Sequence, residues 1–202
     1  MDMEQSLTNK KVTTKDYHSA QTIAEYCVST GDYENAQMYY ETAAVLGPDE
    51  SAPYVGLGTV ALSNELFEEA ELSFKVARRL KPDCPDAYEG LAVVAQKNGN
   101  YEQAFEMYLK CLELDTDNLK ALLGLFQASC QMGSFAKVIH YLELYLDSHP
   151  GDASVMFTLA ALYMKQDGYE KSRDILHRII ELYPDNTDAV NLLEEVQRNL
   201  VD

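Results

Sequence analysis

The chain has 202 residues, and its 33 acidic side chains against 16 basic ones give a formal net charge of −17. A strongly acidic chain repels nucleic acid and anionic membrane surfaces, so neither is expected as a partner. No apolar run reaches the roughly 18 residues of a membrane-spanning helix, and Met1–Lys11 lacks the apolar core of a signal peptide. These features predict a soluble, cytoplasmic protein without direct membrane insertion.

The sequence from Tyr17 to Asn186 divides into five blocks of 34 residues with no insertion or deletion. The blocks are 17–50, 51–84, 85–118, 119–152 and 153–186. Equivalent positions carry equivalent residue types, as the mostly small residues of the second half of each block show: Ala36, Ala70, Ala104, Val138 and Ser172. A period of this length predicts a solenoid, in which each unit buries its apolar face against its neighbours.

Apolar residues within a block recur at steps of three and four, which is the spacing of one helix face. In the second block they are Tyr54, Leu57, Gly58 and Ala61, then Phe67, Ala70, Phe74 and Ala77. Polar residues near Ser63–Leu66 separate the two sets, and Pro82 ends the second. Each block is therefore predicted to form a hairpin of two helices, which makes the protein all-α.

This order of residue types resembles the tetratricopeptide repeat, and the resemblance covers 170 of the 202 residues. The departures are Thr116 in place of a proline, Phe126 and Val138 in place of small residues, and Ser172. The resemblance implies a right-handed α-solenoid of antiparallel helix pairs that binds another protein. Small residues at the matching positions let the two helices of a pair approach closely.

The segments outside the blocks have different predicted roles. Residues 187–202 place Ala189, Leu193, Val196 and Leu200 on one stripe of a helix whose other side is polar. Such a helix is expected to cap the exposed face of the last repeat. Residues 1–16 are polar and without periodicity, so we expect a flexible tail.

Motifs for catalysis, cofactors and metals are not found in the sequence. The four cysteines form no CxxC pair, the histidines occupy unrelated block positions, and no glycine-rich phosphate loop occurs. The run Asp115–Asn118 has Leu119 where a calcium loop needs an oxygen ligand. We therefore expect no enzyme activity, no cofactor and no metal, and we expect reduced cysteines that serve as small apolar residues.

In tetratricopeptide arrays the first helix of each block lines a concave groove, so the resemblance implies a partner-binding site there. Its predicted members are Val55, Gly56, Thr59, Leu62, Glu89, Gly90, Val93, Gln96, Leu123, Gly124, Gln127, Phe157 and Met164. Groove positions carry three acids (Glu25, Asp86, Glu89) and three bases (Lys97, Lys120, Lys165), so the predicted groove is near neutral. The lysine, asparagine and arginine set of carboxylate-clamp co-chaperones is not found at these positions.

Gly56, Gly90 and Gly124 share one groove position in three successive blocks. Two interpretations remain open: the glycines leave a channel for a ligand backbone, or they are small for packing reasons. The apolar groove residues likewise either contact a peptide or amphipathic helix, or pack against the neighbouring first helix.

The predicted function is a non-enzymatic scaffold or adaptor that binds a protein or peptide in this groove. One alternative is a small acidic chaperone for a secreted or membrane-associated client. Another is self-association through the open repeat ends or the groove.

Overall fold

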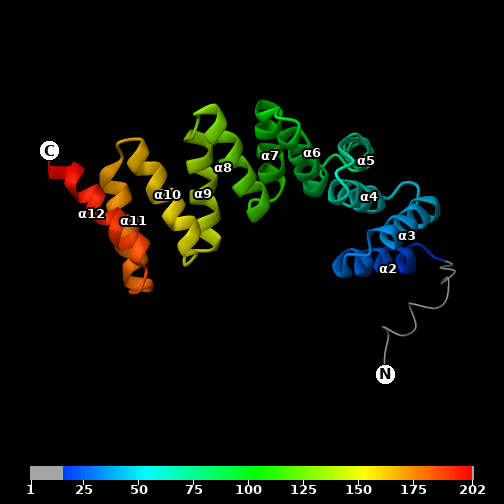
Figure 1. The fold of residues 1–202 in the computed structure, drawn as a ribbon, viewed down its shortest axis with the longest axis horizontal. Coiled ribbons are helices and arrows are strands. Elements are labelled where there is room, and N and C mark those ends of the chain that lie inside the picture. The colour runs from blue at the N-terminus through cyan, green and yellow to red at the C-terminus, as the bar shows by residue number, and fades with distance from the viewer. Residues whose placement is uncertain (1–15, 202) are drawn as a thin grey trace, which may run out of the picture. The chain divides into compact units, whose positions relative to one another are not determined.

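The computed structural model describes residues 16–201, and every regular element in that range is an α-helix (Figure 1). In chain order they are α2 (Tyr17–Thr30), α3 (Tyr33–Leu46), α4 (Ala52–Ser63), α5 (Phe67–Leu80), α6 (Pro85–Lys97), α7 (Tyr101–Leu114), α8 (Leu119–Met132), α9 (Ala136–Ser148), α10 (Ala153–Lys165), α11 (Tyr169–Leu182) and α12 (Thr187–Val201). The all-α prediction is confirmed. The predicted tail falls almost wholly outside the described residues.

Each predicted block contains two helices, and α12 follows the fifth block. The helices form two compact units, one ending at Asn98 and the other beginning at Gly99. In the N-terminal unit, α3 packs on α2 and α4, and α5 packs on α4 and α6. In the C-terminal unit each helix from α7 to α12 packs on the next. No helix between residues 16 and 201 is long and apolar enough to span a bilayer.

The small-residue position of every block is fully buried, as the close approach of paired helices requires. Ala36, Ala70 and Ala104 keep the family type, whereas Val138 and Ser172 depart from it, and all five have no exposed surface. The Ser172 hydroxyl donates a 2.8 Å hydrogen bond to the Ala160 carbonyl of the paired helix. This bond satisfies a polar atom that would be costly to bury alone.

The turn inside each block uses a left-handed backbone at one equivalent residue. Three blocks place glycine there, with φ of 78° at Gly31, 75° at Gly99 and 69° at Gly133. The other two blocks place Glu65 and Asp167 in the same conformation, with φ of 60° and 59°. A side chain in this region costs about 1–2 kcal/mol, so the second and fifth blocks carry local strain.

Replacing Glu65 with glycine should therefore raise the free energy of unfolding by about 1 kcal/mol, after the extra freedom of glycine in the unfolded chain is subtracted. Urea unfolding followed by circular dichroism measures the change. Asn64→Gly is the matched control, because Asn64 has φ of −92° and gains no relief. Equal free energies of unfolding for the Glu65→Gly and Asn64→Gly variants would show that Glu65 is not strained.

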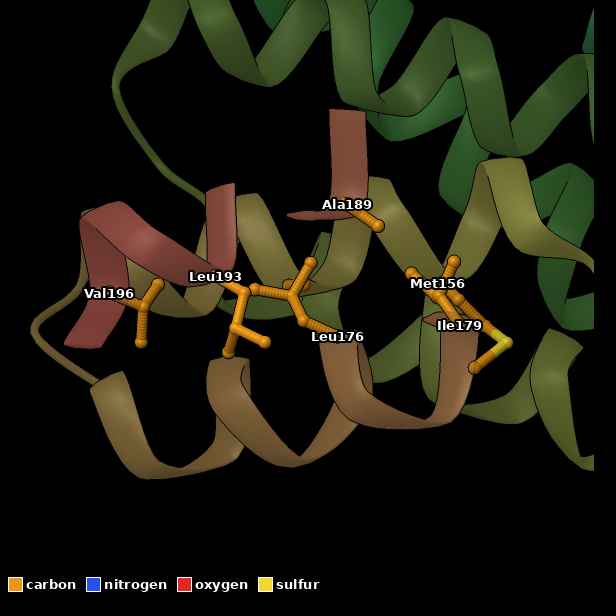
Figure 2. Packing of buried hydrophobic residues seen from close by; sticks show 7 residues of the cluster. Met156, Leu176, Ile179, Ala189, Leu193 and Val196 are labelled. Atoms are coloured by element: carbon orange, nitrogen blue, oxygen red, sulfur yellow. The ribbon is translucent and has the colours of Figure 1, made fainter. Parts of the chain in front are cut away.

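The last helix buries the stripe predicted for it. Ala189 and Val196 have no exposed surface and Leu193 is buried, while Leu200 at the end of the stripe stays partly exposed. Figure 2 shows Leu193 of α12 beside Leu176 of α11, within a cluster that also holds Met156, Ala160 and Ile179. α12 thus contributes to the core of the fifth block.

Candidate functional site

The predicted groove residues of the N-terminal unit are divided between core and surface. Thr59 is exposed, and its hydroxyl donates to the Val55 carbonyl at 2.9 Å. Val55 packs against the cluster of Ala77, Cys84 and Ala87, so this side chain belongs to the packing between helices rather than to an open groove surface. The remaining predicted side chains of this unit are half-buried: Leu62, Glu89, Val93 and Gln96.

The three aligned glycines are buried under aromatic rings of the preceding second helix. A Cβ atom on Gly56 would lie 2.2 Å from the ring of Tyr40, and one on Gly90 would lie 2.3 Å from the ring of Phe74. At Gly124 the corresponding distance to the Tyr108 ring is 2.2 Å. Of the two interpretations, packing therefore describes these positions, because an aromatic ring already occupies the space that a channel would need.

The aromatic rings over these glycines are themselves deeply enclosed. Tyr40, Phe74 and Tyr108 are 5%, 1% and 3% exposed, and they occupy one equivalent position in the first three blocks. Burial, reinforced by the charge of Glu25, raises the pKa of Tyr40 to about 12. The glycine and the ring above it therefore form a repeated packing unit between successive blocks.

In the C-terminal unit, the predicted groove residues separate in the same way. Leu123 is 48% exposed and Gln127 is exposed. Met164 packs against the Met156–Val196 core cluster, so it contributes to stability. Phe157 contacts the same cluster with part of its side chain, and it also lines a pocket at the surface.

This pocket, here called the phenylalanine pocket, lies between α8 and α10 beside the start of α9. It has a volume of about 270 Å³. Its lining comes from these three elements: Phe126, Cys130, Phe135, Phe157, Thr158, Ala161, Leu162 and Lys165. Small-molecule pockets usually have about 300–1,000 Å³, so the space suits one or two side chains better than a whole metabolite.

One cation stands at the phenylalanine pocket. The ammonium group of Lys165 lies 4.6 Å from the centre of the Phe135 ring, which is the geometry of a cation–π contact. Among the described residues, no carboxylate lies within ion-pair distance of Lys165. The pocket thus offers an apolar floor next to an available positive charge.

The four cysteines are all free thiols with different environments. Cys27, Cys84 and Cys111 are buried, as expected of small apolar residues, whereas Cys130 is exposed and lines the phenylalanine pocket. A thiol-directed reagent should therefore mark this pocket selectively.

Two family models, both described as tetratricopeptide repeat, match the chain. One matches residues 23–83 and 55–118, and the other matches residues 131–196. The chain belongs to the tetratricopeptide repeat family. No curated protein matches the sequence. Proteins of this family typically mediate protein–protein interactions and are generally not catalysts.

Several solved structures share the fold at low sequence identity. PilF of Pseudomonas aeruginosa has a TM-score of 0.71 and 18% identity, over 91% of this chain and 85% of its own. YrrB, described as a TPR protein with an unusual peptide-binding site, has a TM-score of 0.65 and 21% identity, over 89% and 92%. MamA of Desulfovibrio magneticus has a TM-score of 0.65 and 17% identity, over 86% and 98%. At these identities the likeness establishes the fold alone.

The family's groove pattern locates most of the phenylalanine pocket but not its aromatic character. That pattern places the groove at positions 2, 5, 6, 9, 12 and 13 of each block, which include Cys130, Phe157, Thr158, Ala161 and Lys165, although of these only Phe157 is among the predicted members named above. The residues that this pattern missed are Phe126, Phe135 and Leu162. Phe126 carried a usable signal, because it stands where the family prefers a small residue. Phe135 gave none, since the other blocks have an aromatic residue at its position too.

Phe135 stands immediately before the start of α9. In the other four blocks this aromatic residue is the first residue of the second helix, whereas α9 begins one residue later, at Ala136. Phe135 precedes the helix, is 6% exposed and lines the pocket together with residues of the two first helices. Phe135 therefore belongs to the buried part of the pocket lining.

Proposed function

We propose that this protein is a non-enzymatic scaffold that binds a peptide or amphipathic helix of a partner protein on the first helices α8 and α10 of its C-terminal unit. The phenylalanine pocket holds an apolar anchor side chain of that ligand. The observation that carries the proposal is the combination of three phenylalanine rings with the ammonium group of Lys165 in one surface pocket. Aromatic pockets of this size are typical sites for the buried anchors that dominate peptide affinity.

The chemistry of the pocket specifies the kind of ligand. Phenylalanine rings favour a leucine, methionine or aromatic side chain, which gains about 1.5–3 kcal/mol on full burial. Lys165 favours a carboxylate beside that anchor, either an acidic residue or a chain end. Exposed Leu123 and Gln127 on α8 provide an adjoining surface for the rest of the segment. YrrB, whose fold is similar, is described as having a peptide-binding site, which supports a peptide ligand here.

Filling the pocket tests the anchor. Ala161→Leu places three additional carbons into a space that can accommodate them, so the fold should remain intact. Peptides selected from a random display library on the full-length protein should carry an apolar residue next to an acidic one. Their affinity for the Ala161→Leu variant should fall about 30-fold, which corresponds to the roughly 2 kcal/mol of a strong anchor.

Charge reversal tests the role of Lys165 with a matched control. Lys165→Glu should weaken the selected peptides, whereas Lys137→Glu should leave them unchanged. Lys137 is also exposed and also lies over a phenylalanine ring, at 6.0 Å from the centre of Phe105, but it does not line the pocket. Isothermal titration measures the peptide affinity of both variants, and melting curves verify that each variant is folded. Peptides that bind the Ala161→Leu protein as tightly as the wild type would place the anchor elsewhere.

A further inference from the structure

A second surface pocket lies in the N-terminal unit, over α4 and between the second helices α3 and α5. Its volume is about 220 Å³, and Val60 of α4, 1% exposed, lies at its base. Glu41 of α3 contributes to one wall, and Leu66, Glu69 and Leu72 come from the α5 side. We call it the α3–α5 pocket. It is formed by elements that the phenylalanine pocket does not use.

Leu66 and Leu72 of the α3–α5 pocket are exposed at positions where most other blocks have no large apolar residue. Leu66 is 43% exposed, and its equivalents are Asp32, Asn100, Ser134 and Gly168. Leu72 is 66% exposed, and its equivalents in the last three blocks are Glu106, His140 and Asp174. The repeat fold itself therefore does not require leucine at either position. Exposed apolar side chains that the fold does not need mark an interaction surface.

The same face of α3 continues this apolar surface. Val45 is 81% exposed and follows Glu41 by four residues, which places it one turn further along that helix face. The equivalents of Val45 in the other blocks are all charged: Arg79, Glu113, Asp147 and Glu181. The exposed apolar side chains of Val45, Leu66 and Leu72 thus lie on or immediately before the second helices of the first two blocks.

The charge around the α3–α5 pocket is predominantly negative. Residues 16–74 contain eleven aspartates and glutamates and no lysine or arginine. Lys75, the first base after them, pairs with Glu71 at 2.7 Å. Gln37 donates a 2.9 Å hydrogen bond to Glu41 and holds that carboxylate in place. In the described part of the chain, no cation lies within ion-pair distance of Glu41 or Glu69.

We propose that the α3–α5 pocket docks a cationic amphipathic segment of a partner protein. An apolar side chain of that segment enters between α3 and α5, and flanking lysines or arginines meet Glu41 and Glu69. Charge complementarity selects this occupant, because an anionic membrane or a nucleic acid would be repelled by the eleven acids. The site is separate from the phenylalanine pocket, so the scaffold presents two binding surfaces of different charge preference.

Three synthetic peptides test the chemistry on the full-length chain by fluorescence anisotropy. The first carries leucines at helical spacing flanked by lysines, the second replaces each lysine with glutamate, and the third replaces each leucine with glycine. The first peptide should bind, and each of the others should bind at least about tenfold more weakly. Its affinity should also fall as salt rises from about 0.15 to about 0.5 M, because carboxylates at a surface are screened.

Paired variants locate the binding. Glu41→Lys should weaken the first peptide about tenfold more than Glu106→Lys, which changes the net charge equally but lies on α7. Leu72→Ser should weaken it about tenfold, since a buried leucine contact is lost. Leu182→Ser should not, although Leu182 is similarly exposed, at 50%.

Several outcomes would overturn the proposal. Equal effects of Glu41→Lys and Glu106→Lys would indicate general attraction to an acidic protein rather than docking. Unchanged binding by the Leu72→Ser variant would show that the leucines are not the apolar contact, and no binding of the first peptide would remove the site. Light scattering that shows a dimer dissociated by Leu72→Ser would assign the surface to a second copy of the chain. None of these outcomes bears on the phenylalanine pocket.

Discussion

Gly90→Ala should destabilise the N-terminal unit by about 1–2 kcal/mol. Overpacking a filled site costs about 1–3 kcal/mol, and alanine regains about 0.5–1 kcal/mol of helix propensity. The cost of overpacking exceeds the gain in helix propensity, because the new methyl group would lie 2.3 Å from the Phe74 ring and that ring has no space to move away. A Cβ on Gly58 would already lie 2.7 Å from the same ring, so Phe74 is held between two glycines.

A double-mutant cycle identifies the cause of this loss. Phe74→Leu alone creates space and lowers stability, but in its presence Gly90→Ala should cost at least about 1 kcal/mol less than in the wild type. Urea unfolding gives the energies, and hydrogen exchange should show the loss in α4–α6. Additive effects of the two substitutions, or a Gly90→Ala protein more stable than the wild type, would refute the packing account and restore Gly90 as an unconstrained helical position.

The sequence predicted the helices well because a strict 34-residue period repeats the same evidence five times. The first block is ambiguous by itself, because Ala20 stands where the other blocks have a larger residue, but the clear pattern of the second block sets its alignment. Even the left-handed turn at Glu65 could be inferred, since glycine occupies that position in three other blocks. Repetition fixes the register, and the register fixes which residues face inward.

The binding surfaces were predicted less well, because register identifies a helix face but not what covers it. Gly90 faces outward from its own helix pair, yet Phe74 of the preceding block lies over it. Met164 similarly occupies a groove position and packs into the core completed by α12. A pattern of single blocks contains no information on such contacts between blocks. They depend on the size of each side chain and on the space that its neighbours leave.

The strongest signals for the pockets were departures from the repeat pattern rather than agreement with it. Phe126 stands where a small residue is usual, and it lines the phenylalanine pocket. Leu66 and Leu72 stand where the last three blocks have no apolar side chain, and they line the α3–α5 pocket. Positions that the fold does not constrain are free to serve binding, so a residue that breaks the repeat without a packing reason is informative.

Deleting residues 187–202 should produce the largest effect of any change considered, a chain that self-associates and has lost the stability of its fifth block. α12 buries Ala189, Leu193 and Val196 against Leu176 and Ile179 of α11. Its removal would expose that apolar face to solvent and create a patch suited to end-to-end association. Size-exclusion light scattering should show higher mass, and hydrogen exchange should show lost protection in α10 and α11.

The N-terminal unit should be unaffected by this deletion, because α12 packs on α11 and α10 within the C-terminal unit. Two point substitutions in the full-length chain test whether the buried side chains of α12, rather than the length of the chain, stabilise the fifth block. Val196→Asp places a charge at a fully buried position and should destabilise the fifth block by several kcal/mol, on the order of 3 or more. Gln197→Asp introduces the same side chain one residue later, where the surface is exposed, and should be nearly neutral. A truncated chain that remains monodisperse with unchanged protection in α11 would show that α12 does not cap the repeat array. Equal melting temperatures of the two point variants would show that the apolar stripe of α12 does not hold this helix in place.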